Sequence, residues 1–346
     1  MRVVGEALGL TESTARSTTV SVAGGHKLTI TILGANMIRV RLDRDSSRTL
    51  ERSWMVAPKV EAGVGDAPYE GRCKNSLDGF ASWDEPSVTA TDDFIQVSTK
   101  TLRVIVPLKL SPLALRWEYF DDAEWRPLLT DRKTGAYYFG RRDERLCHHV
   151  SRRRGDRFFG LGEKSGGLDK SGRRYRMDCH DALGYDAEQS DPLYKFWPFY
   201  IARPADGEVS YGLFYDNPTN CTFDLGCAFD NYHSYFSSYE AVCGDLDYTV
   251  LLGPRVRDVV RRFSRLIGGT ALPPLWSLGY SGSTMSYTDA PDAQVRRLSP
   301  PLPTMSPAPA ALLTLRSASI MPVRRRAWAS FCGCAPPTTS HARPSR

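Results

Sequence analysis

Acidic and aromatic residues are concentrated in the part of the chain between Phe159 and Gly226. Its densest stretch, residues 173–186, reads Arg-Arg-Tyr-Arg-Met-Asp-Cys-His-Asp-Ala-Leu-Gly-Tyr-Asp, and an Asp-Pro-Leu-Tyr-Lys block follows at 191–195. This mixture is typical of sugar recognition, because aromatic rings pack against the C–H faces of a pyranose and carboxylates accept hydrogen bonds from its hydroxyl groups. A packed core does not require so many acids, so the stretch is a candidate carbohydrate-binding region.

Several blocks of this region, and one beyond it, form a recognisable series. They are Phe-Gly-Leu-Gly-Glu at 159–163, the stretch at 173–186, Tyr-Gly-Leu-Phe-Tyr-Asp-Asn at 211–217 and Leu-Pro-Pro-Leu-Trp-Ser-Leu-Gly-Tyr at 272–280. In type and order they closely resemble glycoside hydrolase family 31, the α-glucosidases and α-xylosidases. The resemblance is strong from Phe158 to Asp292 and rests on strand pattern alone before that. It implies an N-terminal β-sandwich related to galactose mutarotase, then a (β/α)8 barrel that hydrolyses α-linked glucosides or xylosides with retention and without a metal or other cofactor.

The catalytic residues of the family have no counterpart in this sequence. A retaining glycosidase needs two carboxyl groups about 5 to 5.5 Å apart, one as nucleophile and one as acid and base. The resemblance places the nucleophile in a Trp-x-Asp-Met-Asn-Glu block on a late barrel strand, and the chain contains no such block. We therefore assign no catalytic residue and expect this polypeptide not to hydrolyse glycosides.

Three residues are candidates for substrate binding by resemblance. Asp181 corresponds to an acid of the sandwich that reaches over the barrel mouth, where a carboxylate accepts two hydroxyl donors at once. Met285 and Tyr287 match a position at the end of the first barrel strand where the family presents a side chain to the glycosyl unit. The alternative for Asp181 is a loop acid that makes local turn hydrogen bonds.

The C-terminal part is too short and too unusual for a barrel. A (β/α)8 barrel needs about 250 residues, whereas 74 remain from Pro273 to Arg346. Residues 295–346 contain eight arginines and nine prolines but no Asp, Glu or Lys. This composition indicates a frameshift or mis-spliced exon near codon 295, or else a natural disordered basic tail. Without these eight arginines the chain has 37 basic and 39 acidic residues, which argues against a nucleic-acid-binding surface on the folded part.

Residue periodicity predicts a mainly β fold. Apolar residues alternate with polar ones at 28–32, 38–42 and 102–106, which indicates antiparallel strands with one buried and one wet face. Residues 60–87 are rich in Gly, Pro, Asp and Ser and read as a mobile loop. An amphipathic helix is expected at 256–267. We therefore expect a galactose-mutarotase-like sandwich over 1–271, a linker and first barrel strand over 272–294, with the strand beginning at 276–280, and a low-complexity tail over 295–346.

Several other classes are disfavoured. The eight cysteines form no Cys-x-x-Cys pair and no zinc spacing. No apolar run is long enough for a membrane span, and residues 1–17 lack the apolar core of a secretory signal, so we expect a cytoplasmic location. The predicted partner is an α-linked oligosaccharide or glycoside, and the oligomeric state is not predicted. A carbohydrate-binding or structural module is the main alternative, and a basic-tailed nucleic-acid binder is a third hypothesis.

Overall fold

The computed structural model describes residues 1–45, 50–57, 70–80, 87–207, 209–228, 231–270 and 272–279. The chain divides into two units, residues 1–270 and 271–346, and the first contains all of the sheets and the one α-helix of the described residues. No helix in these described ranges is long and apolar enough to cross a membrane. The predicted fold class, a mainly β sandwich, is confirmed.

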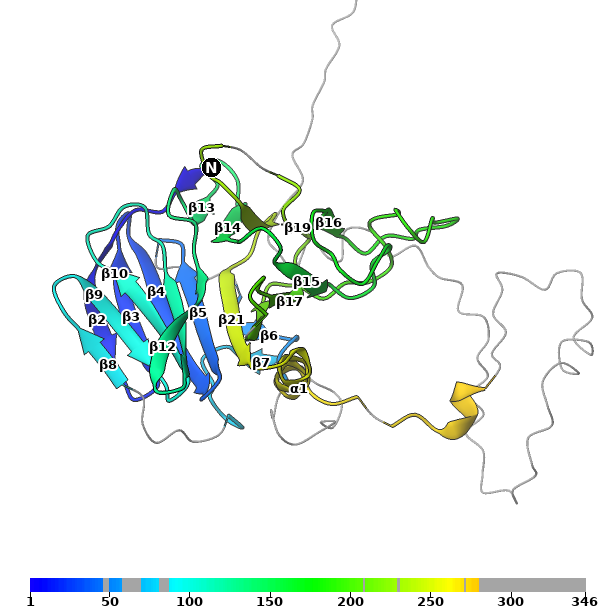
Figure 1. The fold of residues 1–346 in the computed structure, drawn as a ribbon, viewed down its shortest axis with the longest axis horizontal. Coiled ribbons are helices and arrows are strands. Elements are labelled where there is room, and N and C mark those ends of the chain that lie inside the picture. Colours follow the sequence, from blue (N-terminus) through cyan, green and yellow to red (C-terminus); the bar gives the residue numbers. More distant parts are fainter. Residues whose placement is uncertain are drawn as a thin grey trace, which may run out of the picture. The chain divides into compact units, whose positions relative to one another are not determined.

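An eight-stranded antiparallel sheet forms one layer of the sandwich (Figure 1). Its strands, in spatial order, are β15 (Arg157–Gly160), β17 (Phe199–Arg203), β18 (Ser210–Tyr215), β21 (Leu246–Gly253), β5 (Met37–Asp43), β4 (His26–Gly34), β3 (Ser17–Val22) and β2 (Ala7–Ser13). The register pairs Ile30 of β4 with Val40 of β5. These branched side chains therefore lie on the same face, as the alternation predicts.

Two further sheets face this layer. The five-stranded sheet runs in the order β12 (Glu124–Thr130), β11 (Arg116–Asp121), β10 (Leu102–Pro107), β9 (Phe94–Ser98) and β8 (Ser87–Ala90). The six-stranded sheet runs in the order β1 (Arg2–Val3), β13 (Tyr137–Phe139), β14 (Leu146–Ser151), β20 (Phe236–Ala241), β19 (Cys221–Asp224) and β16 (Arg174–Met177). A bridge between Asp131 and Val150 links the two sheets. Side chains from all three sheets form the main core.

The main core contains polar groups that satisfy one another. His148 lies fully buried, with Nδ1 2.9 Å from the Tyr215 hydroxyl and Nε2 3.0 Å from Oδ1 of Asp131. The hydroxyls of Tyr137 and Tyr248 are 2.8 Å apart. Burial raises the pKa of both of these tyrosines well above its usual value, so they remain neutral donors and acceptors. Both ring nitrogens of His148 therefore have hydrogen-bond partners within the core.

The outer face of the eight-stranded sheet is also covered. The predicted helix is confirmed as α1 (Val256–Ile267), which packs on β17, β18 and β21 (Figure 1). Phe263 of α1 stacks on Phe199 of β17 with ring centroids 3.7 Å apart and an interplanar angle of 5°. Gly212 is required beneath the helix, because a Cβ there would lie 2.7 Å from Val259. The sheet is therefore buried on both faces here.

Three sequence expectations differ from the structure. The polar positions of β5 are not all wet, because Arg41 is 5% exposed. Residues 70–80, predicted as part of a mobile loop, include β7 (Arg72–Cys73), paired with β6 (Arg52–Ser53). Where the first barrel strand was expected to begin, residues 275–278 form a 3-10 turn, η1 (Leu275–Leu278), and residues 280–294 of the expected strand region lie outside the described residues. None of the residues of η1 is buried, and a strand needs a partner for its backbone groups, which the described part of the chain does not provide there.

Candidate substrate-facing surface

The acid-rich stretch forms a long loop between β16 and β17. Residues 178–198 contain no strand or helix, and most of the side chains from 179 to 189 are exposed. The loop is nevertheless tied at its second half, where Pro192 and Leu193 are buried and the Leu193 carbonyl accepts the His180 N–H at 3.0 Å. The tip of the loop is therefore exposed to solvent, whereas its second half is held in place by these contacts.

A buried lysine fastens this loop to the neighbouring segment at 161–170. The Lys164 side chain is 1% exposed and its Nζ donates to Oδ1 of Asp191 at 2.7 Å. Asp191 Oδ2 accepts the Arg176 backbone N–H at 2.5 Å, so this carboxylate joins three parts of the chain. Ser165 Oγ donates to the Ser190 carbonyl at 2.6 Å. Charge-assisted bonds of this kind hold a loop in one conformation.

Asp181 lies at the exposed tip, close enough to Tyr194 for the two side chains to interact electrostatically. The pKa of the Tyr194 phenol is raised, first by loss of solvent and then by the negative charge of Asp181, with smaller contributions from Tyr185 and Glu163. These four side chains are therefore close enough to interact electrostatically. Glu163 Oε2 is inaccessible to water and has no hydrogen-bond partner among the described residues. Of the two acids in this cluster, the exposed Asp181 is the one whose oxygens can accept hydrogen bonds from a ligand.

Aromatic side chains surround this cluster of acids. Tyr185 is 54% exposed, Tyr194 45% and Trp197 40%. Trp197 lies against Gly162, whose φ is +80° and where a Cβ would come within 2.1 Å of the indole ring. Glycine is therefore required at this position by both backbone conformation and space. Phe199, by contrast, is 6% exposed and belongs to the core under α1.

The predicted binding residues have different outcomes. Asp181 is an exposed loop residue, and its predicted contact with substrate stays a prediction. Met285 and Tyr287 lie outside the described residues. Sequence reasoning did not single out Glu163 or Trp197, although Glu163 stands in the Phe-Gly-Leu-Gly-Glu block that carries part of the resemblance. The signal was present in the acid directly after Gly162, whose backbone places that acid beside the loop.

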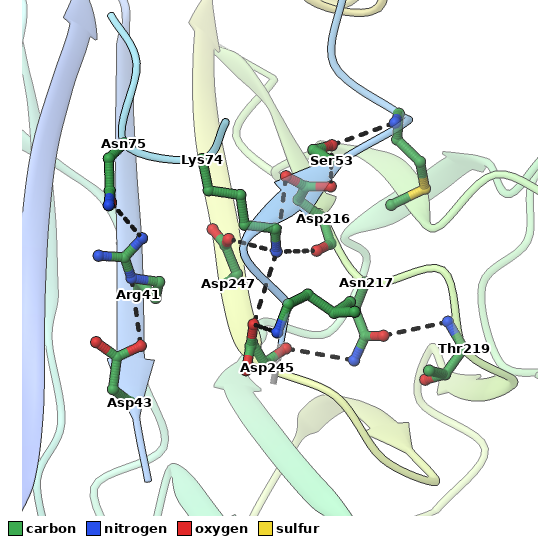
Figure 2. A network of polar contacts seen from close by, with 12 residues as sticks. Arg41, Asp43, Ser53, Lys74, Asn75, Asp216, Asn217, Thr219, Asp245 and Asp247 are labelled. Carbon is green, nitrogen blue, oxygen red and sulfur yellow. Dashed lines mark hydrogen bonds and ion pairs between the residues drawn. The ribbon is translucent and has the colours of Figure 1, made fainter. Parts of the chain in front are cut away.

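A second cluster of charged residues lies under β6 and β7 and serves a structural purpose (Figure 2). Lys74 Nζ lies 3.0 Å from Oδ2 of Asp247 and 3.9 Å from carboxylate oxygens of Asp216 and Asp245. Arg39 Nε donates to Asp247 Oδ1 at 2.7 Å. The adjoining cavity, of about 20 Å³, holds no more than one water molecule. The network therefore has no room for a substrate.

Charge pairing explains the pKa shifts within this network. Burial disfavours the charged form of Asp247, but Arg39 and Lys74 outweigh it and hold the pKa of Asp247 below its usual range. Burial raises the pKa of Asp216, and the negative charge of Asp247 adds to the effect against the opposing Lys74. The pKa of Lys74 is raised because these carboxylates outweigh its desolvation. The three acids thus depend on one ammonium group.

The described residues contain no group of three or more His, Cys, Asp or Glu side chains placed to hold a metal ion. The six cysteines in these ranges form no disulfide bond with one another. The arrangement at the tip of the 178–198 loop can bind hydroxyl groups and stack against a flat apolar face. It does not present two opposed carboxyl groups in a cleft with a water or a leaving oxygen between them.

Comparison with known proteins places this architecture in a family. Residues 27–224 match the model of the glycosyl hydrolase 31 N-terminal galactose mutarotase-like domain. Alpha-glucosidase 2 of Bacillus thermoamyloliquefaciens is 31% identical over 203 residues, which are 59% of this chain and 24% of that protein. Alpha-xylosidase XylQ of Lactiplantibacillus pentosus is 27% identical over 210 residues, 59% of this chain and 25% of that protein. The chain thus spans about a quarter of the length of these relatives.

Solved structures agree on the fold. The glycoside hydrolase family 31 dextranase of Flavobacterium johnsoniae, complexed with glucose, superimposes with a TM-score of 0.65 at 23% identity, over 81% of this chain and 30% of that one. An α-xylosidase from a soil metagenome, complexed with xylose, gives a TM-score of 0.54 at 14% identity over 76% of this chain and 35% of that one. Together with the family model, they show that the chain belongs to glycoside hydrolase family 31 and carries its N-terminal galactose mutarotase-like domain.

Proposed function

We propose that this sandwich is the substrate-facing N-terminal domain of a retaining α-glycosidase, and that its 178–198 loop presents Asp181 to the hydroxyl groups of an α-linked glucoside or xyloside. The observation that carries the proposal is the position of Asp181, which is exposed at the tip of the 178–198 loop and lies close to the Tyr194 side chain. The curated relatives are named α-glucosidases and an α-xylosidase, which supports this substrate class.

Each acid has a defined part in this proposal. A carboxylate has about four acceptor sites, so the exposed Asp181 can accept hydrogen bonds from two sugar hydroxyls at once. Glu163 has one buried oxygen without a partner in the described part of the chain, so its part is to add negative charge beside Asp181 and not to contact the sugar. Tyr185 and Trp197 provide the flat surfaces on which the C–H face of a sugar ring packs.

Hydrolysis needs groups that these 346 residues do not contain. The sequence has no Trp-x-Asp-Met-Asn-Glu block, so we expect the purified polypeptide to release no product from a chromogenic α-glucoside or α-xyloside. Turnover that co-elutes with the protein through chromatography would refute this. Translation of the coding DNA beyond codon 294 in the other two frames tests the frameshift, because a recovered Trp-x-Asp-Met block would show where the catalytic part was lost.

A carbohydrate-binding or structural module is the second candidate, favoured by the three exposed aromatic rings beside the acids. Its test is thermal unfolding with soluble α-glucan oligomers, because a ligand selective for the folded state stabilises it. Sugar at about ten times its Kd would add about 1.4 kcal/mol, which raises the Tm of a domain of this size by roughly 3 °C.

Two variants make that test specific. Asp181→Asn should abolish the shift, while Asp92→Asn, at an exposed acid in the turn between β8 and β9, should keep it. A shift that survives in Asp181→Asn would place the sugar elsewhere on the sandwich. The absence of a shift in the wild type would exclude a stand-alone binding module and leave the substrate-facing role dependent on a barrel.

A further inference from the structure

A second recess lies at the end of the sandwich where β1 pairs with β13, away from the loop that carries Asp181. Its volume is about 310 Å³. Residues lining it include Arg2 of β1, His26 at the start of β4, Arg44 just after β5, Phe139 of β13 and Arg141 in the turn that follows. None of these residues belongs to the Asp181 cluster, and none is assigned a role by the family resemblance.

The charges around the recess are strongly unbalanced. Three arginines and one histidine face a single acid, Asp45. Among the described residues, Arg2 and Arg141 form no ion pair with any carboxylate. Arg44 is positioned by backbone carbonyls, since its Nη2 donates to the Gly140 carbonyl at 2.7 Å and its Nη1 to the Asp143 carbonyl at 3.1 Å. The charges of Arg2 and Arg141 therefore give the lining of the recess a positive potential.

His26 adds an oriented donor to this wall. Its Nδ1 accepts the Asp45 backbone N–H at 3.0 Å, which leaves Nε2 to carry the proton of the neutral ring. Nε2 lies on the side of Gly24, another residue that lines the recess, because a Cβ on Gly24 would be 3.3 Å from that atom. Burial lowers the pKa of His26, while Asp45 opposes this and Arg44 and Arg2 reinforce it. Both arginines therefore act on the same ring.

We propose that this recess binds a phosphomonoester dianion through Arg2, Arg44, Arg141 and the Nε2–H of His26. Planar guanidinium groups match the oxygens of phosphate and give charge-assisted hydrogen bonds. The volume is at the lower end of the roughly 300 to 1,000 Å³ typical of ligand sites, which leaves space for a small organic group beside Phe139 and Val3. Free phosphate and a sugar phosphate share the recognised chemistry.

Titration calorimetry at low ionic strength tests the proposal with the 346-residue protein, purified without N-terminal additions. The ligands are inorganic phosphate, glucose 6-phosphate and uncharged glucose. We expect the two phosphates to bind and glucose not to bind at this site. Tighter binding of glucose 6-phosphate than of phosphate identifies a phosphorylated sugar as the ligand, and equal binding identifies phosphate itself.

Variants separate a built site from general attraction to a basic surface. Arg2→Gln and Arg141→Gln should each weaken phosphate binding about tenfold, the loss of one charge-assisted contact. Arg142→Gln is the matched control, since Arg142 is an exposed neighbour on the same turn that does not line the recess. Equal losses in Arg141→Gln and Arg142→Gln, or no binding of either phosphate by the wild type, would overturn the proposal. Urea midpoints within error of the wild type show that the variants remain folded.

Discussion

Replacing Lys74 by methionine removes the one ammonium group that three buried carboxylates share (Figure 2). The Lys74 side chain is 1% exposed, and those of Asp216, Asp245 and Asp247 are 6%, 5% and 0% exposed. Methionine has a similar length without the charge. Loss of one partner of a buried ion pair costs about 3–5 kcal/mol. Because Arg39 still neutralises Asp247, we expect the lower end, about 3 kcal/mol at about pH 8.

The loss of stability in Lys74→Met should depend on pH, and the charges in the network determine the direction of that dependence. Burial already raises the pKa of Asp216, with Lys74 opposing it, so removing Lys74 raises that pKa further. The folded variant then binds a proton that its unfolded chain, with a carboxyl pKa of about 3.9, does not. Its stability therefore increases as pH falls towards the raised pKa. The loss of stability should therefore be smaller at about pH 5.5 than at about pH 8.

The pKa of Asp247 shifts in the opposite direction to that of Asp216. Asp247 therefore sets the lowest pH at which the effect of Asp216 on stability can be measured alone. Its pKa is lowered in the folded state, so the stability that it contributes is present above the unfolded pKa of about 3.9 and is lost as pH falls below it. Both measurements are made above that window. The comparison of about pH 8 with about pH 5.5 therefore reports on Asp216 and not on acid denaturation through Asp247.

Urea unfolding followed by far-ultraviolet circular dichroism measures these free energies. Lys133→Met, at an exposed lysine, is the control and should change stability by less than about 0.5 kcal/mol. Adding Asp216→Asn to Lys74→Met should recover part of the loss and remove its pH dependence, because the uncompensated charge is gone. A Lys74→Met variant as stable as the wild type, or a loss independent of pH, would refute the reasoning.

Three other changes test separate parts of the fold. Gly162→Ala should displace the Trp197 indole, seen as a changed fluorescence maximum, because the new Cβ would lie within 2.1 Å of the ring; an unchanged spectrum would contradict this contact. Phe263→Ala should cost about 3–5 kcal/mol in urea unfolding, whereas Val260→Ala, at a helix position that is 45% exposed, should cost far less. Asp131→Ala should cost about 3 kcal/mol or more, since buried donors lose their acceptor, and a loss under 1 kcal/mol would argue against the buried network.

The strands and the helix could be predicted from local periodicity, because the pattern of polar and apolar residues in each element involves only neighbours along the sequence. The alternation over 38–42 correctly predicts that Ile38, Val40 and Leu42 face the main core. It fails for Arg39 and Arg41, because residues 70–80 lie over them: Arg39 donates to the Lys74 carbonyl and Arg41 to the Asn75 side chain. A Gly- and Asp-rich composition gives no indication that Lys74 is buried beneath the sheet's outer face. Its partners are more than 140 residues away in the sequence.

The candidate surface was predictable only where the sequence carried a motif. Asp181 was identified by resemblance, whereas its proximity to Tyr194 depends on how the 178–198 loop folds back at Leu193. Glu163 was missed because its place beside the loop results from the positive φ of Leu161 and Gly162. Backbone conformations of this kind are set by tertiary contacts, here those with Trp197 and Phe199, and single-sequence patterns do not reveal them.

The energetics of the loop bear on whether the sandwich alone can hold a sugar. A neutral hydrogen bond contributes only about 0.5–1.5 kcal/mol net when its partners are otherwise solvated, and one to a charged group about 1.5–3. Asp181, Tyr185 and Tyr194 are all exposed, so two or three contacts there reach about 4 kcal/mol, which corresponds to a Kd of about 1 mM. Tighter binding requires a second wall that excludes water. A micromolar Kd for an α-glucan oligomer on the isolated chain, lost in Asp181→Asn, would therefore show that the sandwich forms a complete site and would refute its role as one side of a site completed by a barrel.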